Sequence, residues 1–168
     1  FVTNVYDERG KLMTGADPVS MIALLEGLRV DALGINCSLG PAQMKKLVPV
    51  FARYASLPII VNPNAGLPHS EGGRTIYDVG PEDFAAEMTE IVRLGARIVG
   101  GCCGTTPEYM KRMIEQVRDI APLPLSTKPH TLVSSYTHAV EMGPSPILIG
   151  ERLNPTGKKR LKEALKRE

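Results

Sequence analysis

Four short apolar runs, each followed by a helical pattern that starts with proline, constrain the fold of this chain most strongly. The runs are Phe1–Tyr6, Ala32–Cys37, Pro58–Asn62 and Arg97–Cys102, and turn residues bound each of them, as expected of strands buried on both faces. The first helical positions are taken by Pro18, Pro41, Pro81 and Pro107, where a missing N–H costs nothing. Alternating strands and helices with short connections predict an α/β fold of four consecutive βα units around a parallel sheet.

Two of these helices are preceded by residues suited to capping. Asp17 and Thr106 stand directly before Pro18 and Pro107. A side-chain oxygen at that position can accept a hydrogen bond from an N–H of the first helical turn. We therefore predict that both residues are N-caps.

All three cysteines lie where a predicted strand runs into a glycine-containing turn. Cys37 ends one strand, and Cys102 and Cys103 follow Gly100-Gly101 at the end of another. The carboxyl ends of parallel strands are where α/β folds place their chemistry. Adjacent residues of a regular strand point to opposite faces, so the glycines must allow an irregular turn that aims both sulfurs at one ion. Three converging thiolates predict a tetrahedral zinc site with one open position, which is the catalytic rather than the structural pattern.

Two other interpretations of the cysteines remain open. Each cysteine could be a small buried side chain, because free cysteine is among the most buried residue types. Cys102 and Cys103 could instead carry thiol redox chemistry, although they do not form a Cys-x-x-Cys motif and vicinal disulfides are strained. Zinc binding accounts best for the position of all three at strand ends.

Composition excludes several classes of protein. The chain has 168 residues, a formal net charge of +2 and a hydrophobic content of 43%, close to the average of globular domains. So small a charge predicts no nucleic-acid or anionic-membrane partner, and the absence of a run of 18 apolar residues predicts no membrane span. An odd number of cysteines, two of them adjacent, argues against a disulfide framework and favours a reducing, cytoplasmic setting.

The organisation of the chain predicts two domains joined by a linker. Residues 1–121 form the first domain, in which the long Gly/Pro-rich connection from Pro63 to Gly80 is typical of a loop on a binding face. The proline-rich residues 122–144 are predicted to be a semi-extended linker. Residues 145–168 are predicted to start a second domain.

The predicted second domain is short. Ser145–Gly150 is expected to be a strand, residues 151–157 a loop, and Lys158 the start of a helix, which together make one βα unit. Because the chain opens within a predicted strand and stops within a predicted helix, we expect it to be a piece of a longer polypeptide.

Three segments of the first domain resemble the signature blocks of one enzyme family. Gly34–Pro41, Pro63–Pro68 and Gly100–Pro107 occur in the order of the homocysteine S-methyltransferase blocks, and the resemblance covers residues 1–120. It implies a zinc-dependent (β/α)8 barrel of the TIM type, of which the four units would be the C-terminal half. It also implies that Cys37, Cys102 and Cys103 are the zinc ligands.

A fourth segment resembles one branch of that family. Ile149–Gly157 is similar to the start of the pterin-binding barrel that follows the homocysteine barrel in cobalamin-dependent methionine synthases, although Leu153 and Pro155 depart from the usual form. The resemblance implies a second barrel, with methylcobalamin and methyltetrahydrofolate bound by other modules of the same polypeptide. Asn154 would then be the candidate folate contact.

The predicted chemistry is methyl transfer to the sulfur of homocysteine. A free thiol is mostly protonated at neutral pH, and its thiolate is the reactive form. Zinc would ionise the homocysteine thiol at the open position. By resemblance, the thiolate would then accept a methyl group from methylcobalamin, and ultimately from methyltetrahydrofolate, to give methionine.

Three further residues are predicted to bind substrate: Asn64, Asn36 and Thr105. Asn64 would fill the open zinc position or orient the substrate, unless it is only a turn residue. Asn36 would support the adjacent ligand or cap its turn. Thr105 would help backbone amides to hold a carboxylate, unless it is only a helix-start donor. The three histidines are not expected to form a ligand cluster.

Half a barrel has further consequences. Two unpaired sheet edges would be exposed, so we expect self-association and little turnover by the isolated chain. Two competing functions also remain, namely a non-catalytic zinc-binding half-barrel and a thiol-redox protein.

Overall fold

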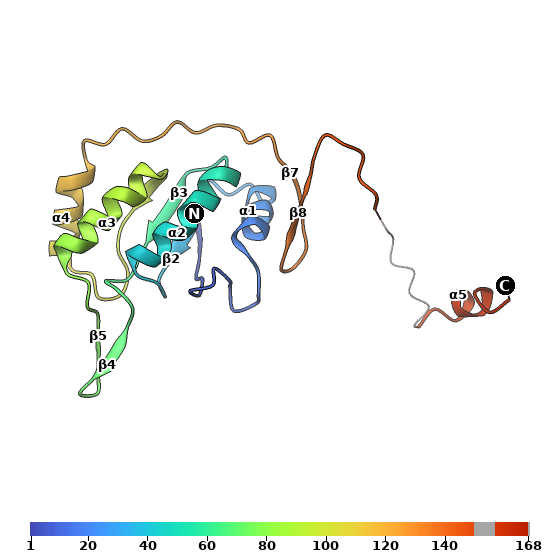
Figure 1. The fold of residues 1–168 in the computed structure, drawn as a ribbon, viewed down its shortest axis with the longest axis horizontal. Helices are drawn as coiled ribbons and strands as arrows, with labels where there is room; N and C mark the ends of the chain where they lie inside the picture. Colours follow the sequence, from blue (N-terminus) through green and yellow to red (C-terminus); the bar gives the residue numbers. More distant parts are fainter. Residues whose placement is uncertain (150–156, 168) are drawn as a thin grey trace.

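The computed structural model describes residues 1–149 and 157–167, and its centre is a four-stranded parallel sheet. The strands β1 (Val2–Asn4), β2 (Leu33–Asn36), β3 (Ile59–Asn62) and β6 (Ala96–Val99) lie side by side in that order. Each is followed by a helix: α1 (Pro18–Gly27), α2 (Pro41–Tyr54), α3 (Pro81–Arg93) and α4 (Pro107–Val117). The prediction of four βα units is confirmed (Figure 1). A proline also starts each of these helices, as predicted.

The helices pack on one face of the sheet. Side chains alternate along a strand, so the residues at matching positions of β2 and β3 share that face, and Leu33, Ile35, Ile59 and Val61 are all buried there. They form one core with residues of α2 and α3 such as Phe51, Phe84 and Met88. This core holds the strand ends, and with them the cysteines, in fixed relation.

The opposite face of the sheet carries a row of small and apolar residues. Thr3, Gly34, Ile60 and Ile98 are neighbours in the strand register. A Cβ added to Gly34 would lie 1.9 Å from the carbonyl oxygen of Ile60, so no other residue fits at that position without separating the strands.

Of the two predicted N-caps, one forms its capping hydrogen bond and the other does not. The carboxylate of Asp17 accepts a hydrogen bond of 2.8 Å from the backbone N–H of Ser20, as predicted. Thr106 occupies the N-cap position of α4, but its side chain caps no N–H, so that part of the prediction was wrong. The neighbouring Thr105 instead closes the turn that precedes α4, because its hydroxyl donates to the carbonyl of Cys102 at 2.7 Å.

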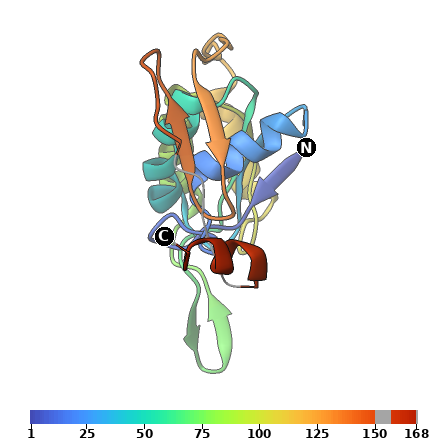
Figure 2. The same ribbon diagram turned by 90° about the vertical axis from the view of Figure 1, so that its right-hand side faces the viewer.

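A hairpin interrupts the long connection before α3. Strands β4 (His69–Glu71) and β5 (Arg74–Ile76) pair antiparallel around Gly72 and Gly73, which have φ of +57° and +76°. Two consecutive positive φ values are what a tight two-residue hairpin turn requires, and glycine supplies them without strain. Figures 1 and 2 show this hairpin extending away from the body of the molecule.

A second hairpin lies within the predicted linker. Strands β7 (Thr131–Ser134) and β8 (Ala139–Met142) pair antiparallel and lie beside α1 (Figure 1). The N–H of Asp17, directly before α1, donates to the carbonyl of Thr137 at 3.2 Å. Residues 122–130 do run extended, from α4 toward this hairpin. The segment predicted to be semi-extended thus contains a hairpin over residues 131–142, and the division of the chain into two domains and a linker stays a prediction.

The predicted strand Ser145–Gly150 is not formed over residues 145–149. Leu148 is fully exposed there, and among residues 1–149 and 157–167 no strand pairs with this segment. An apolar run becomes a strand only when a neighbour satisfies its backbone groups. Gly150 and the loop that contains Asn154 lie outside the described residues.

The helix predicted from Lys158 is present as α5 (Lys159–Ala164). Over the part of the chain that the structure describes, no helix combines the length and the apolar character needed to cross a membrane.

Candidate metal centre

Cys37 lies in a strained turn directly after β2. Its φ is +57° and that of Ser38 is +66°, in the left-handed region that residues with a Cβ seldom adopt. The N–H of Cys37 donates to the carbonyl of Asn62 at 3.0 Å, so the turn is tied to the end of β3. Such strain persists only where the surroundings enforce it, and it is concentrated at functional sites.

Cys102 and Cys103 lie in a second turn, after β6. The N–H of Cys102 donates to the carbonyl of Pro63 at 2.8 Å, which ties this turn to the end of β3 as well. A Cβ on Gly101 would lie 2.5 Å from the hydroxyl of Thr105, and Gly104 has a φ of +79°. The flanking glycines therefore permit the irregular turn that the sequence predicted.

The three sulfur atoms meet at the carboxyl edge of the sheet. The Sγ of Cys103 is 3.7 Å from that of Cys37 and 3.9 Å from that of Cys102, and all three lie within 4.8 Å of one another. A tetrahedral zinc ion with Zn–S bonds of about 2.3 Å requires sulfurs about 3.8 Å apart. The donor set and its spacing therefore fit zinc, and the exposed side chain of Cys103 leaves one side of the site open to solvent.

The thiols differ in their acidity. Burial would raise the pKa of Cys37, but the Ser38 N–H, the other two cysteines and Asn64 donate hydrogen bonds that together lower it. Burial, together with hydrogen bonds to Cys37 and Cys103, raises the pKa of Cys102 to about 11.

Asn64 connects the two cysteine turns. It is 2% exposed, and its side-chain oxygen accepts a hydrogen bond of 3.1 Å from the N–H of Cys103. Its side chain also hydrogen-bonds Cys37, and its own N–H donates to the carbonyl of Leu39 at 3.0 Å. Both ends of the amide are thus engaged by the residues that carry the thiols.

The other predicted substrate-binding residues flank the thiols. Asn36 is the last residue of β2, in register with Asn62 of β3 and adjacent to Cys37. Thr105 holds the carbonyl of Cys102 through its hydroxyl. A role for either residue in binding substrate stays a prediction.

The sequence did not point to Tyr77, which lies beside the thiols. Burial, a hydrogen bond to Cys103 and the charges of the three thiols raise the pKa of Tyr77. Because 26 residues separate Tyr77 from Cys103, only the path of the hairpin brings them together. A long loop rich in glycine was the only sequence signal.

The three histidines stand apart from the site. The ring of His130 hydrogen-bonds Glu141 at 2.6 Å, and that of His138 hydrogen-bonds Thr137 at 2.6 Å. Within the described residues, Cys37, Cys102 and Cys103 form the single cluster of His, Cys, Asp or Glu side chains that could hold a metal ion.

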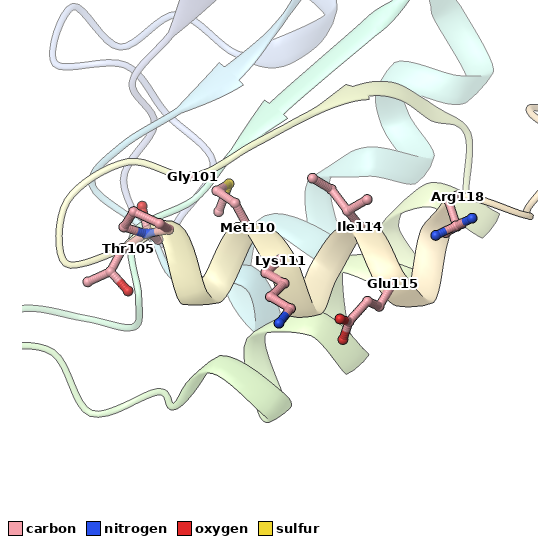
Figure 3. Close-up of a pocket in the computed structure, with 9 residues that line it drawn as sticks. Gly101, Thr105, Met110, Lys111, Ile114, Glu115 and Arg118 are labelled. Carbon is pink, nitrogen blue, oxygen red and sulfur yellow. The ribbon is translucent and has the colours of Figure 1, made fainter.

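A groove of about 780 Å³ runs along the free side of α4 (Figure 3). It begins at Gly101 and Thr105, next to the cysteine turn, and continues past Met110 and Ile114 to Arg118. The thiols do not line it, so it is separate from the metal centre.

Comparison with known proteins agrees with this geometry. The family model "Homocysteine S-methyltransferase" matches residues 1–117. The methionine synthase of Mycobacterium leprae is 33% identical over 173 residues, covering 98% of this chain and 14% of the relative. That of Mycobacterium tuberculosis is 33% identical over 159 residues, covering 93% and 13%. The chain thus spans about one-seventh of the length of these relatives.

Solved structures are similar over the same part of the fold. The homocysteine methyltransferase MmuM from Escherichia coli in its metallated form has a TM-score of 0.52 and 27% identity, covering 71% of this chain and 35% of MmuM. Its oxidised form gives the same TM-score and identity, covering 68% and 35%. The parallel sheet and its βα units therefore match part of the MmuM barrel.

Proposed function

The chain belongs to the homocysteine S-methyltransferase family, and from that premise we propose that Cys37, Cys102 and Cys103 hold a zinc ion whose fourth position takes the sulfur of homocysteine. The observation that carries this proposal is the meeting of three sulfurs, 3.7 and 3.9 Å apart, from two strand ends 65 residues apart in the chain. When bound, zinc supplies the positive charge that ionises a thiol at neutral pH.

The residues of the chain orient this site. The strained turn at Cys37 and the glycine-flanked turn at Cys103 present their sulfurs to one point, and Asn64 holds the two turns together. The exposed side of Cys103 leaves a path for the substrate. The buried amide of Asn64 is already engaged by both turns, which supports a positioning role for it over direct substrate contact.

We propose that the reaction is methyl transfer to sulfur. The homocysteine thiolate attacks the methyl carbon, a new S–C bond forms, and the donor keeps the electron pair of the bond that breaks. The relatives named methionine synthase support a donor of the methylcobalamin type, remethylated from methyltetrahydrofolate. Methylcobalamin and methyltetrahydrofolate would be bound by other modules, so we propose turnover for a protein of the relatives' length. In such a protein Asn154 would contact the folate.

We also propose that this chain by itself self-associates through its sheet edges. In the described part of the chain, β1 pairs only with β2 and β6 only with β3, so each offers a row of free backbone groups. Ile98 of β6 is 37% exposed on the face away from the helices. Light scattering should show dimers or larger species, and a monodisperse monomer would contradict this proposal.

The experiment that tests the site is zinc content under reducing conditions. We expect about one zinc ion per chain in the parent, and loss of zinc in Cys102→Ser. Ser70→Ala, on the exposed hairpin, is the matched control and should keep its zinc. Zinc K-edge absorption should then show a fourth sulfur ligand when homocysteine is added.

Each other outcome points to a competing function. Zinc that does not respond to homocysteine would favour a non-catalytic zinc-binding half-barrel. A zinc-free chain in which Cys102 and Cys103 cycle between thiol and disulfide would favour a redox protein.

A further inference from the structure

The turn that carries Cys102 and Cys103 is the part of the metal centre with the most backbone freedom. Gly100 and Gly101 precede the two cysteines, and Gly104 follows them. Glycine has more accessible backbone conformations than any other residue, so a turn with three glycines needs contacts from outside to hold one shape. Those contacts decide whether the sulfurs keep the spacing that zinc requires.

Hydrogen bonds fix the backbone of Cys103 but not that of Gly104. The N–H of Cys103 donates to the side-chain oxygen of Asn64 at 3.1 Å. The carbonyl of Cys103 accepts a hydrogen bond of 2.9 Å from the N–H of Ala65. Gly104 differs, because among the described residues it forms no backbone hydrogen bond. Packing must therefore set the conformation of Gly104.

The aromatic ring of Tyr77 supplies this packing. A Cβ added to Gly104 would lie 2.5 Å from both Cγ and Cδ2 of the ring, far closer than the 3.5–4.0 Å at which carbon atoms pack. Gly104 also has a φ of +79°. The ring thus covers the face of Gly104 on which any other residue would carry its side chain.

The segment that carries Tyr77 is itself anchored, although the β4–β5 hairpin before it extends away from the body of the molecule (Figures 1 and 2). Two residues on, the N–H of Val79 donates to the carbonyl of Ala65 at 3.0 Å. The carbonyl of Val79 accepts a hydrogen bond of 2.8 Å from the hydroxyl of Tyr109 in α4. The ring of Tyr109 packs edge-on against the buried Phe84, so the segment is tied to the core.

We propose that Tyr77 is a positioning residue of the metal centre, whose ring, packed on Gly104, holds the sulfur of Cys103 at the spacing that the metal requires. This inference rests on the proposed function. Cys103 needs such support because its side chain is exposed, whereas those of Cys37 and Cys102 are partly buried. Contacts from outer residues that orient a ligand raise the affinity for the metal.

The test measures the zinc affinity of the purified chain against a chelator in three variants. Tyr77→Ala removes the ring, and Tyr77→Phe keeps it without the hydroxyl. The control is Tyr136→Ala, which removes a ring that is 75% exposed in the β7–β8 hairpin. We expect zinc affinity to fall about tenfold in Tyr77→Ala, the lower end of what loss of such outer contacts causes. The other two variants should match the parent.

A second readout separates a displaced ligand from a general loss of stability. Co²⁺ in place of zinc gives visible absorption bands that report the geometry of its ligands. At saturating Co²⁺ we expect weaker tetrahedral bands in Tyr77→Ala, because a displaced Cys103 sulfur leaves its position to water. A variant that had only lost stability would reach the spectrum of the parent at saturation, and that result would contradict this inference.

Gly104→Ala reaches the same contact from the other side. The added methyl group cannot coexist with the ring, so Gly104→Ala should lower zinc affinity more in the parent than in Tyr77→Ala, where the ring is gone. The strain of the positive φ is common to both backgrounds and cancels in the comparison. Equal losses in the two backgrounds would mean that the residues do not act through their contact, which overturns this inference.

The remaining outcomes separate this inference from the proposed function. A parent chain that binds neither zinc nor Co²⁺ would overturn both together. A parent that binds zinc, with Tyr77→Ala as tight as the parent, would overturn this inference alone. The same conclusion follows if Tyr77→Phe binds as weakly as Tyr77→Ala, because the ring would then not be what matters, or if Tyr136→Ala loses as much affinity.

Discussion

Two regions of the molecule differ in how much of their apolar surface they bury. The first comprises residues 1–117, and the second comprises residues 118–149 and 157–167. In the first region four strands and four helices share one core, and side chains such as Phe84 and Met88 are fully buried. In the second, β7 and β8 leave Val133 and Val140 more than half exposed, and α5 buries no residue. Periodic patterns became regular structure throughout the first region, whereas an equally apolar run at 145–149 did not. Burial against a neighbour, rather than local propensity, makes the difference.

The largest effect is expected where two strands of the first region touch. Gly34→Ala places a Cβ 1.9 Å from the carbonyl of Ile60, so the central pair of strands must separate, and we expect a loss of more than about 4 kcal/mol. Gly143→Ala is the matched control, because no atom lies within 4 Å of its added Cβ, and should change stability by less than about 0.5 kcal/mol. Urea unfolding followed by circular dichroism measures both. Equal losses would mean that the two regions do not differ.

A large side chain should matter in one region and not in the other. Phe84→Ala removes a ring that is 0% exposed and packs edge-on against Tyr109, at a cost of about 3–5 kcal/mol. Leu148→Ala changes a residue that is fully exposed, so a change within about 0.5 kcal/mol is expected. Thermal denaturation of the two variants measures both changes in stability. A marked loss in Leu148→Ala would show that an unseen contact covers it.

Zinc should stabilise the first region alone. Ligand at 100 times its dissociation constant adds about 2.7 kcal/mol to a folded state that binds it. The three sulfurs come from residues 37, 102 and 103, so hydrogen exchange should slow in β2, β3 and β6 and stay unchanged in β7 and β8. Removal of zinc by a chelator should reverse the effect. If zinc slowed hydrogen exchange equally in both regions, the prediction that it stabilises the first region alone would be contradicted.

The smallest effect is expected at Asp17, which contacts both regions. Burial would raise the pKa of Asp17, but hydrogen bonds from Ser20 and the ammonium of Lys11 lower it. A lowered pKa stabilises the fold fully above the unfolded value of about 3.9, and that contribution is lost as the pH falls through the folded pKa. Asp17→Ala should therefore cost about 1 kcal/mol at pH 6 and progressively less below about pH 4. Unfolding at several pH values measures this.

The control for Asp17→Ala is Asp119→Ala. The side chain of Asp119 is 91% exposed and lies 3.9 Å from the guanidinium of Arg118, so its loss should leave stability unchanged at every pH. If the two variants behave alike, the cap hydrogen bond contributes nothing.

The metal centre divides in the same way into what was predictable and what was not. The three cysteines were identifiable from their places at strand ends, because parallel strands bring their carboxyl ends to one edge. Tyr77 was not, because a hairpin of unknown direction carries it to Gly104. Asn64 was singled out, but its engagement with both cysteine turns required the packed loops to be seen.

The sequence by itself determined the alternation of strands and helices, the prolines that start the helices and the convergence of the thiols, since these depend on periodicity and on backbone chemistry local to each residue. Only the tertiary structure decided that residues 131–142 pair as a hairpin beside α1, that residues 145–149 remain irregular, and that the ring of Tyr77 lies against Gly104. Those outcomes depend on which distant segment supplies a hydrogen-bond partner or a surface to bury against, and no local pattern encodes that choice.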